Sequence, residues 1–137
     1  MPARSFIDTN ILIYTDDHDS PSKQERSLEV IESARLSGSG VVSTQVLQEY
    51  FVTATRKLGV DARIARRKVE LFSRLNLVEV KLETILGAVD LHQLHQLSFW
   101  DSLIVRAALD SGCSELLTED LSDQQRLDGL QIVNPFL

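Results

Sequence analysis

The sequence predicts a three-layer α/β/α protein with a mostly parallel central sheet of about five strands. Short apolar segments alternate along the chain with longer segments of helical periodicity, which is the pattern of parallel sheets with helices on both faces. The short segments at 41–43, 115–117 and 131–133 are largely apolar. Such runs are typical of strands that are buried on both faces.

The first segments of the chain predict a strand followed by a helix. Residues 5–7 form a short apolar strand, and residues 11–15 either continue it or begin a helix. The next helix runs from about Pro21 to Leu36, because proline suits the first helical position. Ser22 and Glu25 have the spacing of a capping box in this helix. The glycines and serines at 37–40 end it.

The middle of the chain predicts a strand and a helical hairpin. Residues 40–43 are a short buried strand. Apolar residues then recur at helical spacing from Thr44 to Leu58, and Gly59 ends that helix. Asp61 can cap a second helix that continues through Ser73. These two helices form the hairpin.

The last part of the chain predicts three more strands and two more helices. Ser98 and Asp101 have capping-box spacing at the start of the final helix, and Gly112 ends it. The expected strands are 77–80, 115–118 and 130–133, and the expected helices are 82–96 and 98–111.

Composition limits the class of protein. The chain has 137 residues, which predicts a single domain over 1–137. A net charge of −6 argues against a protein that coats nucleic acid, because such a protein would be basic. One cysteine, Cys113, allows no intrachain disulfide and suits a reducing cytoplasm. No apolar run approaches the length of a membrane span, and we expect neither a membrane partner nor a signal peptide.

Positive charge is concentrated in the predicted hairpin. This basic stretch is either a solvated helix face or a surface that faces phosphates or a partner. Half of the 14 lysines and arginines belong to it: Arg56, Lys57, Arg63, Arg66, Arg67, Lys68 and Arg74.

Two acidic residues follow predicted strands. Asp8 follows the first strand, and Asp120 follows the strand that ends at Thr118. Because the carboxyl ends of parallel strands meet at one edge of the sheet, both acids are expected at that edge, where ligands bind. Asp8 is either a site residue or only the cap of the next helix. Its position in the sequence favours neither interpretation.

Two further acids lie on predicted helices. Asp101 lies beside Ile104 and Ala108 on a helical wheel, at the margin of the apolar face, so its carboxylate is expected to be partly buried. Glu49 lies off the apolar stripe of its helix, where a solvated side chain is the simpler interpretation.

Several carboxylates at one edge of a sheet would repel one another. Two of them at 4 Å oppose each other by about 4 kcal/mol at an effective dielectric near 20. Either some take up protons or a cation lies between them. Oxygen ligands without histidine or cysteine favour Mg²⁺ or Mn²⁺. Such an ion serves phosphate-ester chemistry.

Four segments resemble the motifs of PIN-domain nucleases, in the same order along the chain. They are residues 6–12, 45–51, 99–104 and 116–121. The ending at 129–136 is similar to that of VapC-type toxins from bacterial toxin–antitoxin pairs. The resemblance covers nearly the whole chain.

The resemblance implies a metal site made of Asp8, Glu49, Asp101 and Asp120. Asp8 and Asp101 are the expected direct ligands. Glu49 and Asp120 act through water or orient the attacking water. Asp123 is a further candidate acid. The resemblance also implies that Asn10 and Thr118 are neutral polar support for the acids.

The implied activity is Mg²⁺- or Mn²⁺-dependent hydrolysis of RNA that leaves a 5′-phosphate and a 3′-hydroxyl. The implied partners are a second copy of the chain and a small VapB-like antitoxin that inserts a segment into the active-site groove. The basic stretch then either guides RNA phosphates or holds an acidic antitoxin.

Two other functions remain open from the sequence. The acids could bind a cation or a partner without turnover. Alternatively, Asp8 could be the nucleophile of an aspartyl-phosphate phosphatase. Such an enzyme needs a second aspartate where Asn10 stands and a downstream lysine, but no lysine follows Lys81.

Overall fold

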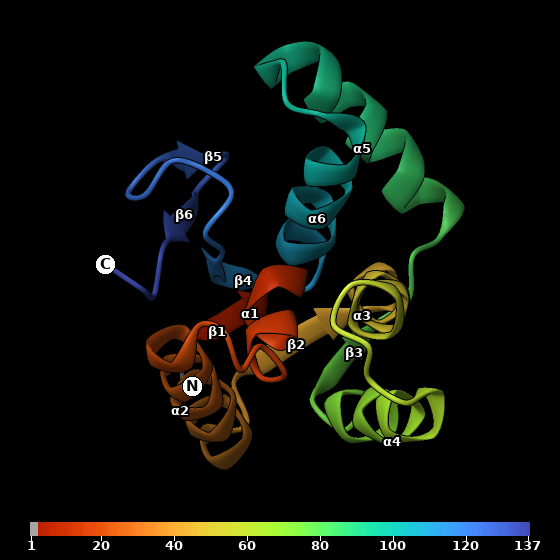
Figure 1. The fold of residues 1–137 in the computed structure, drawn as a ribbon. Helices are drawn as coiled ribbons and strands as arrows, with labels where there is room; N and C mark the ends of the chain where they lie inside the picture. Colours follow the sequence, from red (N-terminus) through yellow and green to blue (C-terminus); the bar gives the residue numbers. More distant parts are fainter. Residues whose placement is uncertain (1–2) are drawn as a thin grey trace.

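The computed structural model describes residues 3–137, in which six strands form one sheet surrounded by six helices (Figure 1). The strands are β1 (Arg4–Ile7), β2 (Gly40–Ser43), β3 (Asn76–Val78), β4 (Cys113–Leu117), β5 (Arg126–Leu127) and β6 (Leu130–Val133). They lie in the order β3-β2-β1-β4-β6-β5. All neighbours are parallel except β5 and β6. The predicted, mostly parallel sheet is therefore confirmed.

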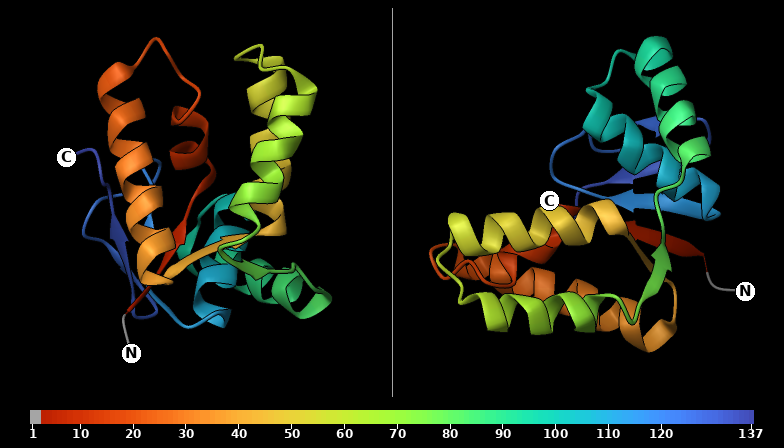
Figure 2. Two further views of the ribbon diagram at one scale, coloured as in Figure 1. Left: turned by 90° about the horizontal axis from the view of Figure 1, so that it is seen from below. Right: turned by 90° about the vertical axis from the view of Figure 1, so that its right-hand side faces the viewer.

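The helices cover both sides of this sheet. They are α1 (Thr9–Tyr14), α2 (Pro21–Ser37), α3 (Thr44–Arg56), α4 (Ala62–Phe72), α5 (Leu82–His95) and α6 (Phe99–Asp110). In Figure 1, α5 and α6 lie on one side of the sheet and α2 on the other. Figure 2 shows α3 and α4 side by side as the predicted hairpin. Within residues 3–137, no helix combines the length and apolar character that crossing a bilayer requires.

Two elements differ from the simplest expectation. Residues 9–14 are helical, so the chain turns directly after β1 instead of extending it. The short strand β5 was not predicted, although the chain carries a local signal for it. Asp128 and Gly129, which join β5 to β6, both have positive φ angles, of 52° and 91°. An Asp-Gly pair in this conformation is typical of a tight antiparallel hairpin.

The start of α2 corrects one detail of the prediction. The helix begins at Pro21, as expected, but Ser20 occupies the N-cap position and Ser22 lies inside the first turn. The predicted capping box of Ser22 and Glu25 is therefore wrong. Proline favours the first helical position because it has no N–H group to satisfy and its φ is already helical. The cap is thereby placed one residue before Pro21.

The core is centred on β1 and its two neighbours. Phe6, Val41 and Leu116 are fully buried, on β1, β2 and β4 respectively. Helix α2 packs closely on this sheet, because a Cβ atom at Gly40 would lie 2.8 Å from the Cβ of Ala34. Only glycine permits this approach.

Strand β1 lies at the point where the topology reverses. Its neighbours β2 and β4 are reached through helices on opposite sides of the sheet. The crevice beyond the carboxyl ends of two such strands is the usual ligand site of an open α/β sheet. Asp8 and Thr118 are the first residues after β1 and β4, and the N–H of Asp8 donates to the carbonyl of Leu117 at 3.0 Å.

Candidate active site

Asp8 caps helix α1, as one of its two interpretations predicted, and its carboxylate is also buried. Its side chain caps α1 by accepting a 2.7 Å hydrogen bond from the N–H of Thr9. Its other carboxylate oxygen accepts a 2.8 Å hydrogen bond from the hydroxyl of Thr118. The residue is only 5% exposed. Asp8 is thus a helix cap and a buried acid at the edge of the sheet.

Burial raises the pKa of Asp8 to about 7. The hydrogen bonds from Thr118 and Thr9 lower this pKa, because they stabilise the carboxylate, and the negative charges of Asp120 and Glu49 raise it. Two of the other three predicted acids therefore lie within electrostatic reach of Asp8.

Asp120 is joined to Asp8 through two polar side chains. The amide of Asn10 donates to the carboxylate of Asp120 at 3.0 Å and to the hydroxyl oxygen of Thr118 at 3.2 Å. The N–H of Asp120 also donates to that oxygen, at 3.1 Å. Asn10 and Thr118 thus lie between the two acids and contact both sides of the site.

Glu49 faces the same edge from α3. It accepts a 2.6 Å hydrogen bond from the hydroxyl of Thr9, the residue after Asp8. The amide of Gln45 donates to the other oxygen of Glu49 at 3.3 Å and to the carbonyl of Trp100 at 3.2 Å. The interpretation of Glu49 as a solvated side chain is wrong, because tertiary packing places α1 and α6 against this part of α3.

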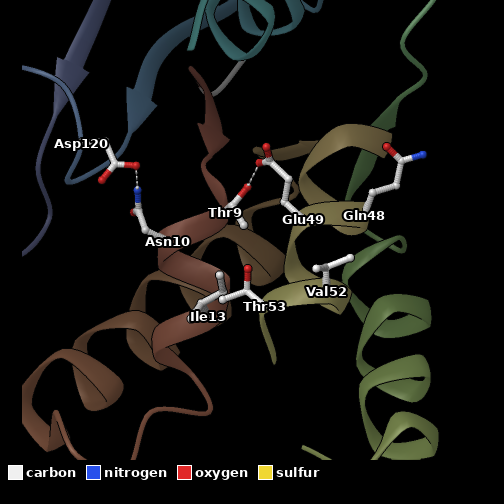
Figure 3. A pocket seen from close by; sticks show the side chains of 8 residues that line it. All are labelled: Thr9, Asn10, Ile13, Gln48, Glu49, Val52, Thr53 and Asp120. Carbon is white, nitrogen blue, oxygen red and sulfur yellow. Dashed lines mark hydrogen bonds between the residues drawn. The ribbon is translucent and has the colours of Figure 1, made fainter. Parts of the chain in front are cut away.

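A pocket of about 480 Å³ opens between α1 and α3 (Figure 3). Glu49 and Asp120 lie on opposite sides of it, held by Thr9 and Asn10 respectively. The side chains of Ile13, Thr53 and Val52 lie below them in this view. The lining residues are Thr9, Asn10, Ile13, Gln48, Glu49, Val52, Thr53 and Asp120.

Asp101 and Asp123 are not joined to this group of acids. Asp101 is half-buried in the first turn of α6, where its N–H donates to Ser98. Within residues 3–137 its carboxylate makes no hydrogen bond or ion pair, although the neighbouring carbonyl of Trp100 is tied to Gln45. Asp123 accepts a 2.8 Å hydrogen bond from the N–H of Asn134 and so holds the C-terminal segment.

The acids fit a divalent cation in charge and donor type. The set offers oxygen atoms alone, and none of Asp8, Glu49 and Asp120 forms an ion pair within the described residues. The acids do not form a complete ligand shell. Within residues 3–137, no three acidic, histidine or cysteine side chains lie close enough together to share an ion.

The basic stretch divides into inward and outward side chains. Lys68 points inward, where its ammonium group lies 2.7 Å from Asp16 and 2.6 Å from the hydroxyl of Thr15. Arg66 and Arg67 both pair with Glu70 on the surface of α4. The remaining members are exposed: Arg56, Lys57, Arg63 and Arg74.

Comparison with known proteins identifies the fold family. The sequence profile of the PIN domain matches residues 5–130. The chain is a PIN-domain protein. A comparison with curated protein sequences finds no significant match.

Solved structures share this PIN fold over nearly the whole chain. A toxin–antitoxin complex from Klebsiella pneumoniae is 22% identical, with a TM-score of 0.69, and the match covers 96% of this chain and 97% of that one. DNA-bound VapBC from Salmonella typhimurium is 21% identical, with a TM-score of 0.66 and coverages of 96% and 97%. The sarcin-ricin loop cleaving toxin VapC20 of Mycobacterium tuberculosis is 17% identical, with a TM-score of 0.66 and coverages of 85% and 91%.

Two polar residues of this PIN domain were missed by the sequence analysis. Thr9 holds Glu49, and Gln45 joins Glu49 to the start of α6. Gln45 could have been found, because it lies four residues before Glu49 on a predicted helix and therefore shares its face. The contact of Thr9 with Glu49 joins residues 40 positions apart and has no local signal.

Proposed function

We propose that this PIN domain is a divalent-metal-dependent ribonuclease and the toxin of a toxin–antitoxin pair. One observation supports this most directly. The negative charges of Glu49 and Asp120 act on Asp8 at the carboxyl edge of β1 and β4, and this repulsion contributes to the raised pKa of Asp8. A cation bound there would relieve the repulsion.

The four acids would have the different roles in metal binding that the family resemblance implies. Asp8 and Asp101 would hold a Mg²⁺ or Mn²⁺ ion directly, and Glu49 and Asp120 would act through water or orient it. When bound, such an ion activates water and neutralises charge on a phosphodiester under attack. Thr9 and Thr118 donate to Asp8 and so favour its charged, metal-binding form.

The exposed part of the basic stretch would contact RNA phosphates or an acidic antitoxin. Arg56 and Lys57 close the end of α3 and form no ion pair within residues 3–137. Cationic side chains without intramolecular partners are available to phosphates. Lys68 is a poor candidate for this role, because Asp16 already neutralises it.

We further propose a VapB-like antitoxin and a homodimer in the cytoplasm. Two of the structural neighbours are toxin–antitoxin assemblies, which supports the antitoxin. The homodimer is supported by an exposed apolar stripe on α5, whose members are spaced as one face of a helix: Leu82, Ile85, Leu86 and Val89. Burying such a stripe is favourable because it removes apolar surface from water.

The spacing of the acids favours one alternative function. Because no three of them within the described chain lie at metal-sharing distance, the domain could bind a partner without turnover. Cleavage assays separate this binding module from the nuclease.

The test is to incubate purified, antitoxin-free protein with total cellular RNA in the presence of Mg²⁺, Mn²⁺ or a chelator. We expect cleavage with metal only, and we expect Asp101→Asn and Asp120→Asn to abolish it. Asp90→Asn, at an exposed position on α5, is the matched control and should cut normally. Folded, partner-free protein that leaves a broad panel of RNAs intact would favour the binding module. If the Asp101→Asn variant still cuts RNA, the assignment of Asp101 to the metal site is wrong.

A further inference from the structure

The carboxylate of Glu119 is held by two side chains that lie outside the pocket. The hydroxyl of Tyr14 donates to one of its oxygens. The ammonium group of Lys23 lies 2.5 Å from the other oxygen and 3.3 Å from the hydroxyl of Tyr14. We call these three residues the Glu119 cluster.

The Glu119 cluster joins four parts of the chain. Tyr14 is the last residue of α1, Lys23 lies in the first turn of α2, and Glu119 lies in the loop after β4. The C-terminal segment contributes Phe136, whose ring lies edge-on to that of Tyr14 with centroids 5.1 Å apart. The ammonium group of Lys23 lies 5.0 Å from the ring centroid of Tyr14 and 5.5 Å from that of Phe136, within the range of cation–π attraction.

The loop that carries Glu119 and Asp120 depends on side chains for its conformation. It has no regular secondary structure, and the N–H groups of both residues donate to side-chain oxygens instead of backbone carbonyls. The acceptors are the amide oxygen of Asn10, at 3.4 Å, and the hydroxyl of Thr118, at 3.1 Å. Backbone hydrogen bonds to β6 hold this loop at Thr118 and at Gln124, on either side of Asp120. Between these points the N–H groups of Glu119 and Asp120 bind side chains, so side-chain contacts contribute to the position of Asp120.

Helix α1 holds the loop of Glu119 and Asp120 through two of its side chains. Asn10, in its first turn, holds the carboxylate of Asp120, and Tyr14, at its last position, holds Glu119. The neighbouring residues Glu119 and Asp120 are thus tied to the same short helix at two points. A loop held at two points on a rigid element loses most of its freedom to rotate.

We propose that Tyr14, Lys23 and Glu119 are positioning residues that hold Asp120 in the orientation needed for metal binding. This inference rests on the proposed function, because it assigns Asp120 to the metal site. Tyr14 and Lys23 do not line the pocket, so their effect on metal binding passes through the loop. Groups that hydrogen-bond a metal ligand are typically worth 10- to 100-fold in metal affinity. Tyr14 and Lys23 contact the residue beside Asp120 and not Asp120 itself, so we expect an effect at the lower end of that range.

The test compares two tyrosine hydroxyls that both bind a carboxylate. Tyr14→Phe removes the hydroxyl that holds Glu119 and keeps the ring that packs on Phe136. Tyr50→Phe is the matched control, because its hydroxyl donates to Asp16 at 2.5 Å and has no contact with the loop of Asp120. Glu119→Gln is the second variant. Mn²⁺ binding to the metal-free proteins is measured by electron paramagnetic resonance, alongside thermal unfolding and the kcat and KM of RNA cleavage.

We expect Tyr14→Phe and Glu119→Gln to weaken Mn²⁺ binding by about tenfold and to lower kcat more than they change KM. Tyr50→Phe should lower thermal stability only. Wild-type Mn²⁺ affinity in folded Tyr14→Phe would overturn the inference and leave the proposed function intact. A wild-type protein that neither binds Mn²⁺ nor cuts RNA would overturn both. If Glu119→Gln does not fold, Tyr14→Phe decides the result.

Discussion

The hydroxyl of Thr118 donates a 2.8 Å hydrogen bond to the buried carboxylate of Asp8. The bond joins the residues that follow the two central strands, β4 and β1, which are 110 positions apart in the chain. The same hydroxyl oxygen accepts hydrogen bonds from Asn10 and from the N–H of Asp120. The hydroxyl of Thr118 therefore contacts both Asp8 and Asp120.

Replacing Thr118 by valine should destabilise the domain by about 1–3 kcal/mol, because a buried carboxylate and two donors lose their shared partner. The pKa of Asp8 should rise further, since this hydrogen bond lowers it. Urea unfolding at pH 8 measures the first effect, and Thr118→Ser, which keeps the hydroxyl, is the control. Equal stability of the valine and serine variants at pH 8 would contradict the role assigned to Thr118.

The stability contribution of Asp8 should fall as the pH rises from about 4 to about 7 in metal-free buffer. Burial is the main cause of a folded-state pKa of about 7, against 3.8 for the free side chain. In this interval the folded protein therefore binds more protons than the unfolded chain. The contribution is fully present below the lower pKa and lost above the higher one, a change on the order of 4 kcal/mol.

Unfolding of the wild type and Asp8→Asn in urea, with chelator, isolates this effect. The wild type should lose stability relative to the variant across that pH interval, because asparagine does not titrate. Saturating Mn²⁺ should remove most of the loss in the wild type, since a bound cation favours the carboxylate. Parallel pH profiles for the two proteins without metal would show that Asp8 titrates normally.

Glu49→Gln should lower the pKa of Asp8, because it removes one of the two negative charges that raise it. The amide can still accept the hydrogen bond from Thr9, so the fold should be kept. A carboxyl-detected NMR titration measures the pKa. RNA cleavage should fall roughly 10- to 100-fold. Glu79→Gln, at an exposed position, should change neither quantity.

Replacing Lys68 should lower the stability of the domain, whereas replacing Arg56 should weaken RNA binding. Lys68→Gln leaves Asp16 with the hydroxyl of Tyr50 but without its cationic partner. The side chain of Asp16 is only 14% exposed, so we expect a loss of about 2 kcal/mol in unfolding free energy. Arg56→Gln should leave stability within about 0.5 kcal/mol. Arg56→Gln should weaken RNA binding. It should also reduce, by about one, the slope of the logarithm of the binding constant against the logarithm of the salt concentration, because one phosphate contact is lost. Binding titrations across salt concentrations, beside urea unfolding, compare the two. A salt dependence unchanged in Arg56→Gln would argue for an antitoxin contact.

Leu86→Glu should convert the proposed homodimer to a monomer. Leu86 is 56% exposed at the centre of the apolar stripe on α5, and a charge there would be buried without a partner in the dimer. Light scattering after size-exclusion chromatography measures the mass. Glu83→Gln, an exposed change on the same helix, should stay dimeric. A wild type that is monomeric at high concentration would rule out the homodimer.

The sequence by itself determined most of the helices and strands, apart from α1 and β5, and the edge of the sheet at which two acids meet. Pro21 and Gly38 mark the ends of α2, and the apolar run at 130–133 coincides with β6. Each of these signals acts through neighbouring residues, either through a fixed dihedral angle or through the periodicity of burial. The placement of Asp8 and Asp120 followed from the parallel strand pattern alone.

Tertiary structure decided which side chains hold the acids. Thr9 reaches Glu49 across 40 residues, and Tyr14 reaches Glu119 across 105. The helical wheel placed Glu49 in solvent, because a wheel represents one helix and not the helices packed beside it. Likewise, Lys68 is turned inward by Asp16, 52 residues earlier. Hydrogen-bond partners and pKa shifts depend on which elements come together in space, and the order of residues along the chain does not specify that at the level of single atoms.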